Sequence, residues 1–191
     1  MISSGHHNIK KLETALNKRQ KTKKHFTMNI QDYTATILVK QTPAIAFDAV
    51  KNFRAWWSEQ IEGETDKLNE VFFYQYKDVH LCKIKLIEIV PDKKLVYHIL
   101  DNHFSFTEDK TEWINTKLIF EITTEGGDTK IKFTHEGLNS THECYNICYD
   151  SWGNYINKSL YNLITTGKGS PNPLDGEGFN VEIVEKWKLK S

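Results

Sequence analysis

The sequence predicts an α+β fold in which a curved antiparallel sheet wraps around one long C-terminal helix. Short segments of alternating apolar and polar residues follow one another from about residue 71 to residue 135. This pattern is typical of antiparallel strands joined by turns. The period then changes, and residues 145–163 carry apolar side chains three and four positions apart, as an amphipathic helix does. A sheet with one apolar face needs such a helix as its cover.

The chain before these strands predicts one more strand and two short helices. Residues 33–41 are rich in Thr, Ile and Val, which favour strands. Thr42 and Pro43 then have the pattern of an N-cap followed by the first helical position. A second apolar stretch at residues 53–57 follows that helix and ends in a tandem Trp.

Turns divide the middle of the chain into its predicted strands. Pro91-Asp92-Lys93 and Gly126-Gly127-Asp128 have the residues that hairpin turns prefer. The polar stretch 101–109 and the last segment, 179–189, are left without an assignment. We predict strands at 71–76, 81–90, 94–100, 114–122 and 130–135, about six or seven in all with the first strand.

The charge distribution divides the chain further. Its net charge is zero, but residues 1–28 hold seven Lys and Arg against Glu13 alone. This basic arm therefore carries +6 and the remainder −6, which argues against a nucleic-acid-binding body. We predict an arm at residues 1–27, a folded domain at 28–171 and a C-terminal extension at 172–191. The arm is interpreted as a transit peptide, a nucleic-acid arm or a tail that precedes a true start at Met28.

Compartment and membrane contact follow from simple counts. The sequence has no apolar run of 18 residues, so no membrane span is expected. It has three cysteines, a small and odd number, whereas a secreted disulfide scaffold usually has a larger, even number. We therefore predict a cytoplasmic protein with reduced thiols.

Three stretches of the sequence resemble a known family. They are the Pro-centred hairpin 86–97, the hairpin 126–138 with its Gly-Gly turn and Thr-His-Glu-Gly-Leu end, and the helix 152–163 that leads to Thr-Gly-Lys-Gly at 166–169. In order and spacing these stretches resemble the START-like (SRPBCC, helix-grip, Bet v 1-like) superfamily. Within it they are similar to the group named after the activator of heat-shock-protein-90 ATPase. The resemblance covers about residues 28–171.

The resemblance implies a fold more firmly than a function. It implies a helix-grip fold: a curved sheet around a long C-terminal helix, with two short helices after the first strand. Members of the superfamily include carriers of hydrophobic ligands, polyketide cyclases or aromatases, stress-related proteins and co-chaperones. They share no universal catalytic motif, so the resemblance names no catalytic residue and no cofactor.

A cavity between the sheet and the long helix is the candidate binding site. Aromatic side chains with polar ends suit an apolar or aromatic ligand, although the same spacing also describes ordinary core packing. Trp56 and Trp57 are placed at the mouth of this pocket or at the end of the core. The predicted ligand-binding residues are Tyr97, Phe133, His135, Tyr149, Trp152 and Tyr155.

His135 is the most informative single residue. Strand alternation places it on the same face as Ile131 and Phe133, which is the face toward the helix. It is either a polar anchor or acid–base group in an apolar pocket, or a structural histidine bonded to the backbone before Gly137. A titratable group without a partner is not a mechanism, so we favour the structural role.

Other clusters of reactive side chains give weaker signals. Cys144 and Cys148 lie four residues apart on the last helix, with His142 and Cys82 as further candidates for a metal site. The paired spacing typical of zinc sites is absent, so buried free thiols are favoured and no metal is predicted. Phosphate-binding loops, nucleophile elbows and dinucleotide fingerprints are also absent.

The leading hypothesis is binding of an apolar or aromatic small molecule between the sheet and the long helix. The first alternative is a protein-interaction module of the co-chaperone type, with a chaperone or a second copy of the chain as partner. The second is an enzyme of the cyclase or aromatase type, which would need at least two polar groups converging in the cavity.

Overall fold

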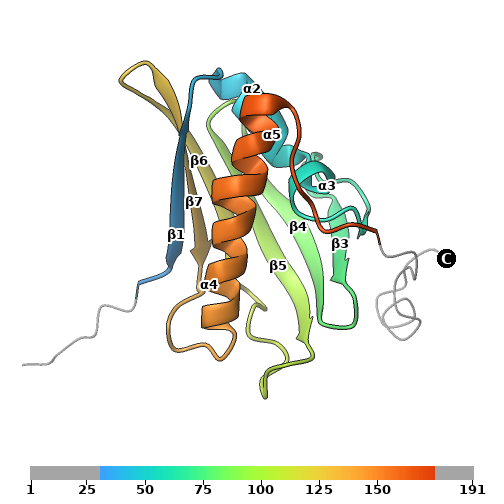
Figure 1. Cartoon of the computed structure of the whole chain (residues 1–191). Coiled ribbons are helices and arrows are strands. Elements are labelled where there is room, and N and C mark those ends of the chain that lie inside the picture. The colour runs from blue at the N-terminus through green and yellow to red at the C-terminus, as the bar shows by residue number, and fades with distance from the viewer. Residues whose placement is uncertain (1–30, 175–191) are drawn as a thin grey trace, which may run out of the picture. The chain divides into compact units, whose positions relative to one another are not determined.

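The structure, a computed structural model, describes residues 31–174 (Figure 1). Within this range one antiparallel sheet has the order β1-β7-β6-β5-β4-β3-β2. The first strand therefore pairs with the last, and every other neighbouring pair is consecutive in sequence. The strands are β1 (Tyr33–Val39), β2 (Ile61–Glu62), β3 (Val71–Tyr76), β4 (His80–Val90), β5 (Lys94–Phe104), β6 (Lys117–Glu125) and β7 (Asp128–Glu136).

Two short helices, α2 (Pro43–Lys51) and α3 (Phe53–Trp56), follow β1. The Thr42 hydroxyl accepts the backbone N–H of Ile45 at 3.4 Å, so the predicted cap is present. The long C-terminal helix consists of α4 (Tyr145–Asn154), a π-helical stretch η1 (Tyr155–Leu160) and α5 (Tyr161–Thr166). It ends at Gly167, whose φ of 78° is the left-handed conformation that glycine adopts readily.

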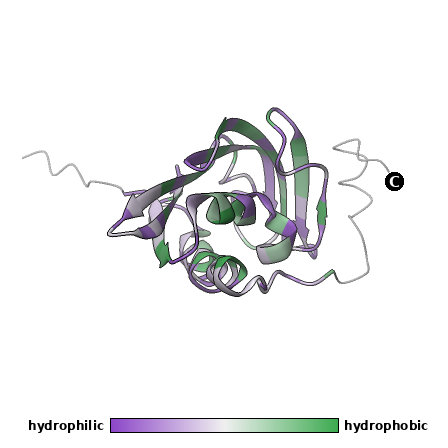
Figure 2. Cartoon of the chain, turned by 90° about the horizontal axis from the view of Figure 1, so that it is seen from above, coloured by the Kyte–Doolittle hydropathy of each residue, from purple (hydrophilic) through white to green (hydrophobic). Residues whose placement is uncertain are grey.

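The helices lie inside the curve of the sheet. Figure 1 shows the long helix running across the concave face, and Figure 2 shows the strands bending around it. The inward face of β7 carries Ile131, Phe133 and His135, all fully buried, as the alternation predicts. Order, layers and helices are those of the predicted helix-grip fold, which is confirmed.

Two irregularities change the inward face along β4 and β5. Ile84 pairs with Ile99 and Lys83 with Asp101, so Leu100 is an extra residue on β5. A second register shift leaves Ile87 of β4 without a partner. Because one extra residue reverses which side chains point inward, Asn102 and Phe104 face the interior after Leu100. β5 thereby extends into the polar stretch that the sequence left without an assignment.

One predicted strand begins too early. The sequence places residues 114–122 in a strand, but β6 begins only at Lys117. Residues 111–115 form a turn that ends at Asn115, with φ of 67°. The Thr116 hydroxyl donates to the carbonyl of Trp113 at 2.6 Å and stabilises this turn. The segment 179–189, which the sequence left without an assignment, lies outside the described residues.

Residues 168–174, here called the closing segment, follow the long helix and pack on α3. Asn172 makes two backbone bonds of 2.9 Å, donating to the Trp57 carbonyl and accepting from Glu59. The Ser159 hydroxyl joins the segment to the helices, because it accepts from the Ser170 N–H and donates to the Trp56 carbonyl, both at 2.7 Å. The Leu174 N–H also donates to Glu59 Oε2 at 3.0 Å, so hydrogen bonds fix the closing segment at Ser170, Asn172 and Leu174.

Candidate ligand-binding site

A cavity of about 200 Å³ lies at one end of the space between the sheet and the long helix. Its lining comes from the end of β3, the start of β4, the end of β5 and α4, together with the turn before β6 and the closing segment. Six aromatic side chains form its wall: Trp57, Tyr74, Phe104, Trp113, Trp152 and Tyr155.

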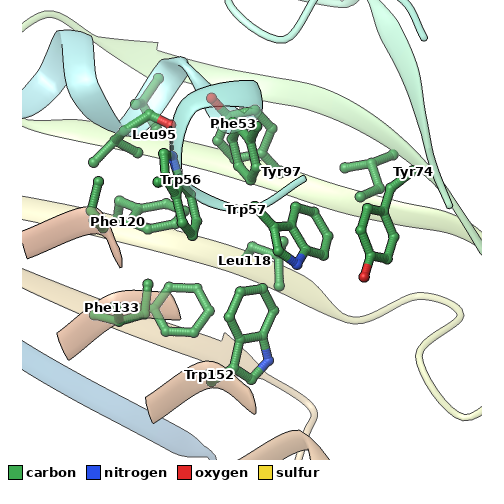
Figure 3. Close-up of a cluster of buried hydrophobic side chains, with 14 of the residues drawn as sticks. Phe53, Trp56, Trp57, Tyr74, Leu95, Tyr97, Leu118, Phe120, Phe133 and Trp152 are labelled. Atoms are coloured by element: carbon green, nitrogen blue, oxygen red, sulfur yellow. Dashed lines mark hydrogen bonds between the residues drawn. The ribbon is translucent and has the colours of Figure 1, made fainter. Parts of the chain in front are cut away.

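The rings of this wall support one another. Trp57 stacks on Tyr74 with ring centroids 4.1 Å apart, and it also contacts Trp152 at 5.4 Å. Figure 3 shows Trp57 between these two residues, which come from the sheet and from the helix. Trp152 in turn stacks on Trp113 at 5.7 Å, nearly parallel. These contacts hold Trp57 and Trp152 between neighbouring rings.

The mouth of the cavity is apolar as well. Tyr76, Phe106 and Ile147 line it and are among the most exposed large hydrophobic residues of the described chain, at 37%, 40% and 56%. None of the fourteen residues that line the cavity is Lys, Arg, Asp or Glu. The lining therefore suits an uncharged ligand.

A few polar groups interrupt this apolar lining. They belong to His80, Cys148, Ser151 and Asn172, besides the tyrosine hydroxyls and the buried indole N–H of Trp113, which has no partner among the described residues. The Asn172 side-chain amide donates to the Tyr155 hydroxyl at 2.7 Å. Burial raises the pKa of Tyr155, and it raises the pKa of Tyr74 well above the usual value, so both phenols stay neutral.

His80 is held by a buried polar network on β4 and β5. Its Nε2 lies 3.0 Å from Asn102 Oδ1 and 3.0 Å from Cys82 Sγ. The Cys82 thiol donates to Asn102 Oδ1 at 3.1 Å, and Asn102 Nδ2 donates to the Lys110 carbonyl at 3.1 Å. Phe104 and Trp113 pack on the imidazole, with centroids 4.3 and 4.5 Å away.

Burial sets the protonation of this network. It lowers the pKa of His80 to about 3, although the hydrogen bond to Asn102 acts in the opposite direction. Burial also raises the pKa of the Cys82 thiol well above its usual range. His80 is therefore a neutral imidazole and Cys82 a protonated thiol at neutral pH, so the pair lacks the thiolate that a nucleophile needs.

His135 is fully buried beneath the long helix, and both its ring nitrogens are paired. The Trp152 indole N–H donates to Nδ1 at 3.0 Å, and Nε2 lies 2.9 Å from the Thr116 hydroxyl. Since an indole N–H can only donate, Nδ1 is the acceptor and Nε2 carries the proton. Burial lowers the pKa of His135 well below its usual range. Its partners are side chains, not the backbone.

The predicted site residues, apart from Tyr149, lie either at the cavity or in the filled part of the core. Trp152, Tyr155 and Trp57 line the cavity. The others expected in or beside the pocket, His135 included and Tyr149 excepted, lie in the filled part of the core. Tyr97 there donates to the Thr65 carbonyl at 3.1 Å, Trp56 donates to the Val50 carbonyl at 3.1 Å, and Phe133 packs on Phe120 and Trp152.

Tyr149 lies at the edge of the long helix that faces β1. Its side chain is 53% exposed, and its ring contacts Tyr33 edge-on at 5.3 Å. The helical spacing predicted that Tyr149 and Trp152 share the face of the helix that points toward the sheet. Tyr149 stands at the border of that face, so most of its ring remains exposed.

The cysteines are buried and free. Cys148 lines the cavity, whereas Cys82 and Cys144 do not. Between residues 31 and 174, no three His, Cys, Asp or Glu side chains are grouped as a metal site would require. In the same part of the chain, no helix combines the length and apolar character needed to cross a membrane.

Sequence reasoning missed three of the six rings of the cavity wall, Tyr74, Phe104 and Trp113, and it missed His80. His80 could have been found, because alternation of Cys82, Ile84 and Leu86 with lysines extends back to position 80. Phe104 was hidden by the extra residue at Leu100. Trp113 stands in a turn, where no periodic pattern indicates the direction of a side chain.

Comparison with known proteins agrees with this architecture. The profile of the family described as "Activator of Hsp90 ATPase homolog 1-like protein" matches residues 48–165, more than half of the chain. No curated protein matches its sequence.

Several solved structures share the fold at low sequence identity. The Aha1 dimer from Colwellia psychrerythraea is 20% identical with a TM-score of 0.59, over 73% of this chain and all of its own. Protein MLL2253 from Mesorhizobium loti is 10% identical with a TM-score of 0.56, over 70% and 96%. CalU16 from Micromonospora echinospora is 12% identical with a TM-score of 0.51, over 72% and 75%. At such identities the likeness concerns the fold alone.

Proposed function

The chain belongs to the activator of Hsp90 ATPase homolog 1-like family of the START-like superfamily, and from this premise we propose that it binds a small uncharged aromatic molecule. The observation that carries the proposal is the cavity of about 200 Å³ walled by six aromatic rings. The cavity opens through an apolar mouth, so a small molecule can reach it. An apolar space bordered by packed aromatic rings is the feature that a ligand explains.

The volume limits the size of the guest. An apolar cavity of about 150 Å³ is large enough to take up benzene. The cavity here suits one substituted ring, or the ring end of a longer molecule that leaves through the mouth at Tyr76, Phe106 and Ile147. Binding would be driven by burial of apolar surface, worth about 25 cal/mol per Å² before the costs of ordering.

The chemistry of the lining favours binding over catalysis of the cyclase type. A general base works best when its pKa lies near the operating pH. His80, the one imidazole at the cavity, has its pKa lowered to about 3 by burial and is a poor base at neutral pH. The phenols of Tyr74 and Tyr155 stay protonated. These groups can orient a ligand without transforming it.

Toluene is the probe that tests this proposal. We expect saturable binding to the purified protein by isothermal titration calorimetry, together with a rise in the melting temperature. The Ser151→Leu variant fills the cavity from α4 and should lose this binding. Its matched control is Asp150→Leu, the adjacent and exposed position, which should bind toluene like the unaltered protein. Equal binding by Ser151→Leu, or none by the unaltered protein, would contradict the proposal.

The co-chaperone alternative makes a different prediction. It is supported by the family description and by the similarity to the Aha1 dimer. Native mass spectrometry of protein purified from its own source separates the two: a small retained molecule supports ligand binding, whereas a chaperone bound in fixed proportion and no retained molecule supports the alternative.

A further inference from the structure

The His80 imidazole has one hydrogen-bonding position that the protein does not use. Its Nε2 is paired with Asn102 and Cys82, as described above. Its Nδ1 has no hydrogen-bond partner among residues 31–174. The residue is 9% exposed and lines the cavity. Among residues 31–174 the buried side-chain atoms without a partner are Gln41 Oε1 and Trp113 Nε1, so His80 Nδ1 keeps some exposed surface and can meet a molecule in the cavity that the residue lines.

The network fixes which nitrogen carries the proton. Asn102 Nδ2 donates to the Lys110 carbonyl, so the amide is oriented with Oδ1 toward His80. A carbonyl oxygen only accepts, and His80 Nε2 must therefore be the protonated nitrogen. Nδ1 then presents a lone pair, and a neutral acceptor is fixed at the cavity wall.

A neutral acceptor selects the chemistry of its partner. A carboxylate has no proton to donate at neutral pH, and a cation would enter a lining without any acidic residue to balance it. A hydroxyl on an aromatic ring meets both conditions, because it is uncharged and donates strongly.

We propose that His80 is the polar specificity group of the cavity, whose Nδ1 accepts a hydrogen bond from a hydroxyl on the ring of the bound molecule. The ligand class is thus a neutral hydroxylated aromatic. This inference rests on the proposed function, since it concerns the same cavity.

Three probes that differ at one substituent test the inference by calorimetry. p-Cresol carries the hydroxyl, toluene lacks it, and 4-methylanisole keeps the oxygen but has no proton to donate. The unaltered protein should bind p-cresol about tenfold more tightly than either of the others. Toluene binding without this preference would overturn the role of His80 and leave the proposed function intact. Absence of binding by all three would overturn both.

Two variants locate the acceptor. His80→Phe keeps an aromatic ring at the wall and should lose the preference for p-cresol while it still binds toluene. His98→Phe is the matched control, because it makes the same substitution at a half-buried strand position that does not line the cavity. This variant should keep the preference. Retention of the preference in His80→Phe would overturn the inference. Should His80→Phe fail to fold, equal affinities of the unaltered protein for p-cresol and 4-methylanisole would overturn it.

Discussion

The two buried histidines of this domain have the same chemistry in different surroundings. His135 lies in the filled part of the core, and His80 lies at the edge of the open part. Burial is the largest cause of a lowered pKa in both. The difference is in their partners: both nitrogens of His135 are bonded, whereas His80 has one nitrogen bonded and the other free among the described residues.

This comparison separates a structural group from a binding group. A shifted pKa often indicates a functional site, but structural networks shift pKa values too. His135 joins β7 to the long helix through Trp152 and has no capacity left for a ligand. His80 is oriented by Asn102 and keeps its free nitrogen at a cavity. The count of unused hydrogen-bonding positions, and not the pKa, distinguishes them.

The largest expected effect is on stability. His135→Ala removes a fully buried ring and leaves Trp152 and Thr116 without their partner, so the free energy of unfolding should fall by about 3 kcal/mol. His80→Ala enlarges an existing cavity and should lower the free energy of unfolding by about half that amount. His98→Ala, at a half-buried strand position, is the control and should cost roughly 0.5 kcal/mol. Urea unfolding measures all three, and equal losses for the first two would contradict the comparison.

The next effect concerns pH. Both histidines stay neutral in the folded domain while they bind protons in the unfolded chain, whose histidine pKa is about 6.5. The contribution of the neutral histidines to the free energy of unfolding should therefore be fully present above pH 6.5. It should fall as the pH decreases toward 3, the pKa that burial gives His80. Between pH 7 and pH 5, each histidine should lower the free energy of unfolding by about 2 kcal/mol. His80→Phe should lose about 2 kcal/mol less than the unaltered protein over this range, and an identical loss would contradict the neutral state of His80.

A smaller effect tests the closing segment beside the cavity. A Cβ at Gly169 would overlap the backbone carbonyl oxygen of Ala55, so Gly169→Ala should displace the segment and lower the free energy of unfolding by about 1–2 kcal/mol. Gly153→Ala is the matched control, because its helical position has open space. This control should stabilise the protein by about 0.5–1 kcal/mol, as alanine favours helices over glycine. An unchanged free energy of unfolding in Gly169→Ala would show that the segment is not held against α3.

The smallest effect is at the polar end of the cavity. Asn172→Ala removes the hydrogen bond to Tyr155 but keeps the backbone bonds of the closing segment. Stability should fall by only about 0.5–1 kcal/mol, and toluene should exchange faster, as measured by NMR line shapes. Asn162→Ala, at an exposed position of α5, should change neither property.

The fold was predictable because its determinants are local. The Thr42 cap, the alternation that places Ile131, Phe133 and His135 inward, and the helical period after residue 145 are all visible in one sequence. The cavity was less predictable for two physical reasons. One extra residue at Leu100 reverses the inward face of β5, and the filling of an interior depends on how side chains from distant elements meet. Trp152, Tyr155 and Trp57 were named because they belong to periodic or tandem patterns, whereas Trp113 belongs to neither.

The central claim is that His80 alone of the two buried histidines meets the ligand. It is tested most directly by ¹⁵N NMR of histidine-labelled, unaltered protein during titration with p-cresol and, separately, toluene. We predict that p-cresol shifts the unprotonated Nδ1 resonance of His80, that toluene leaves it nearly unchanged, and that Nδ1 of His135 responds to neither. A shift of His135 with none at His80, or an equal response of His80 to both probes, would contradict the account.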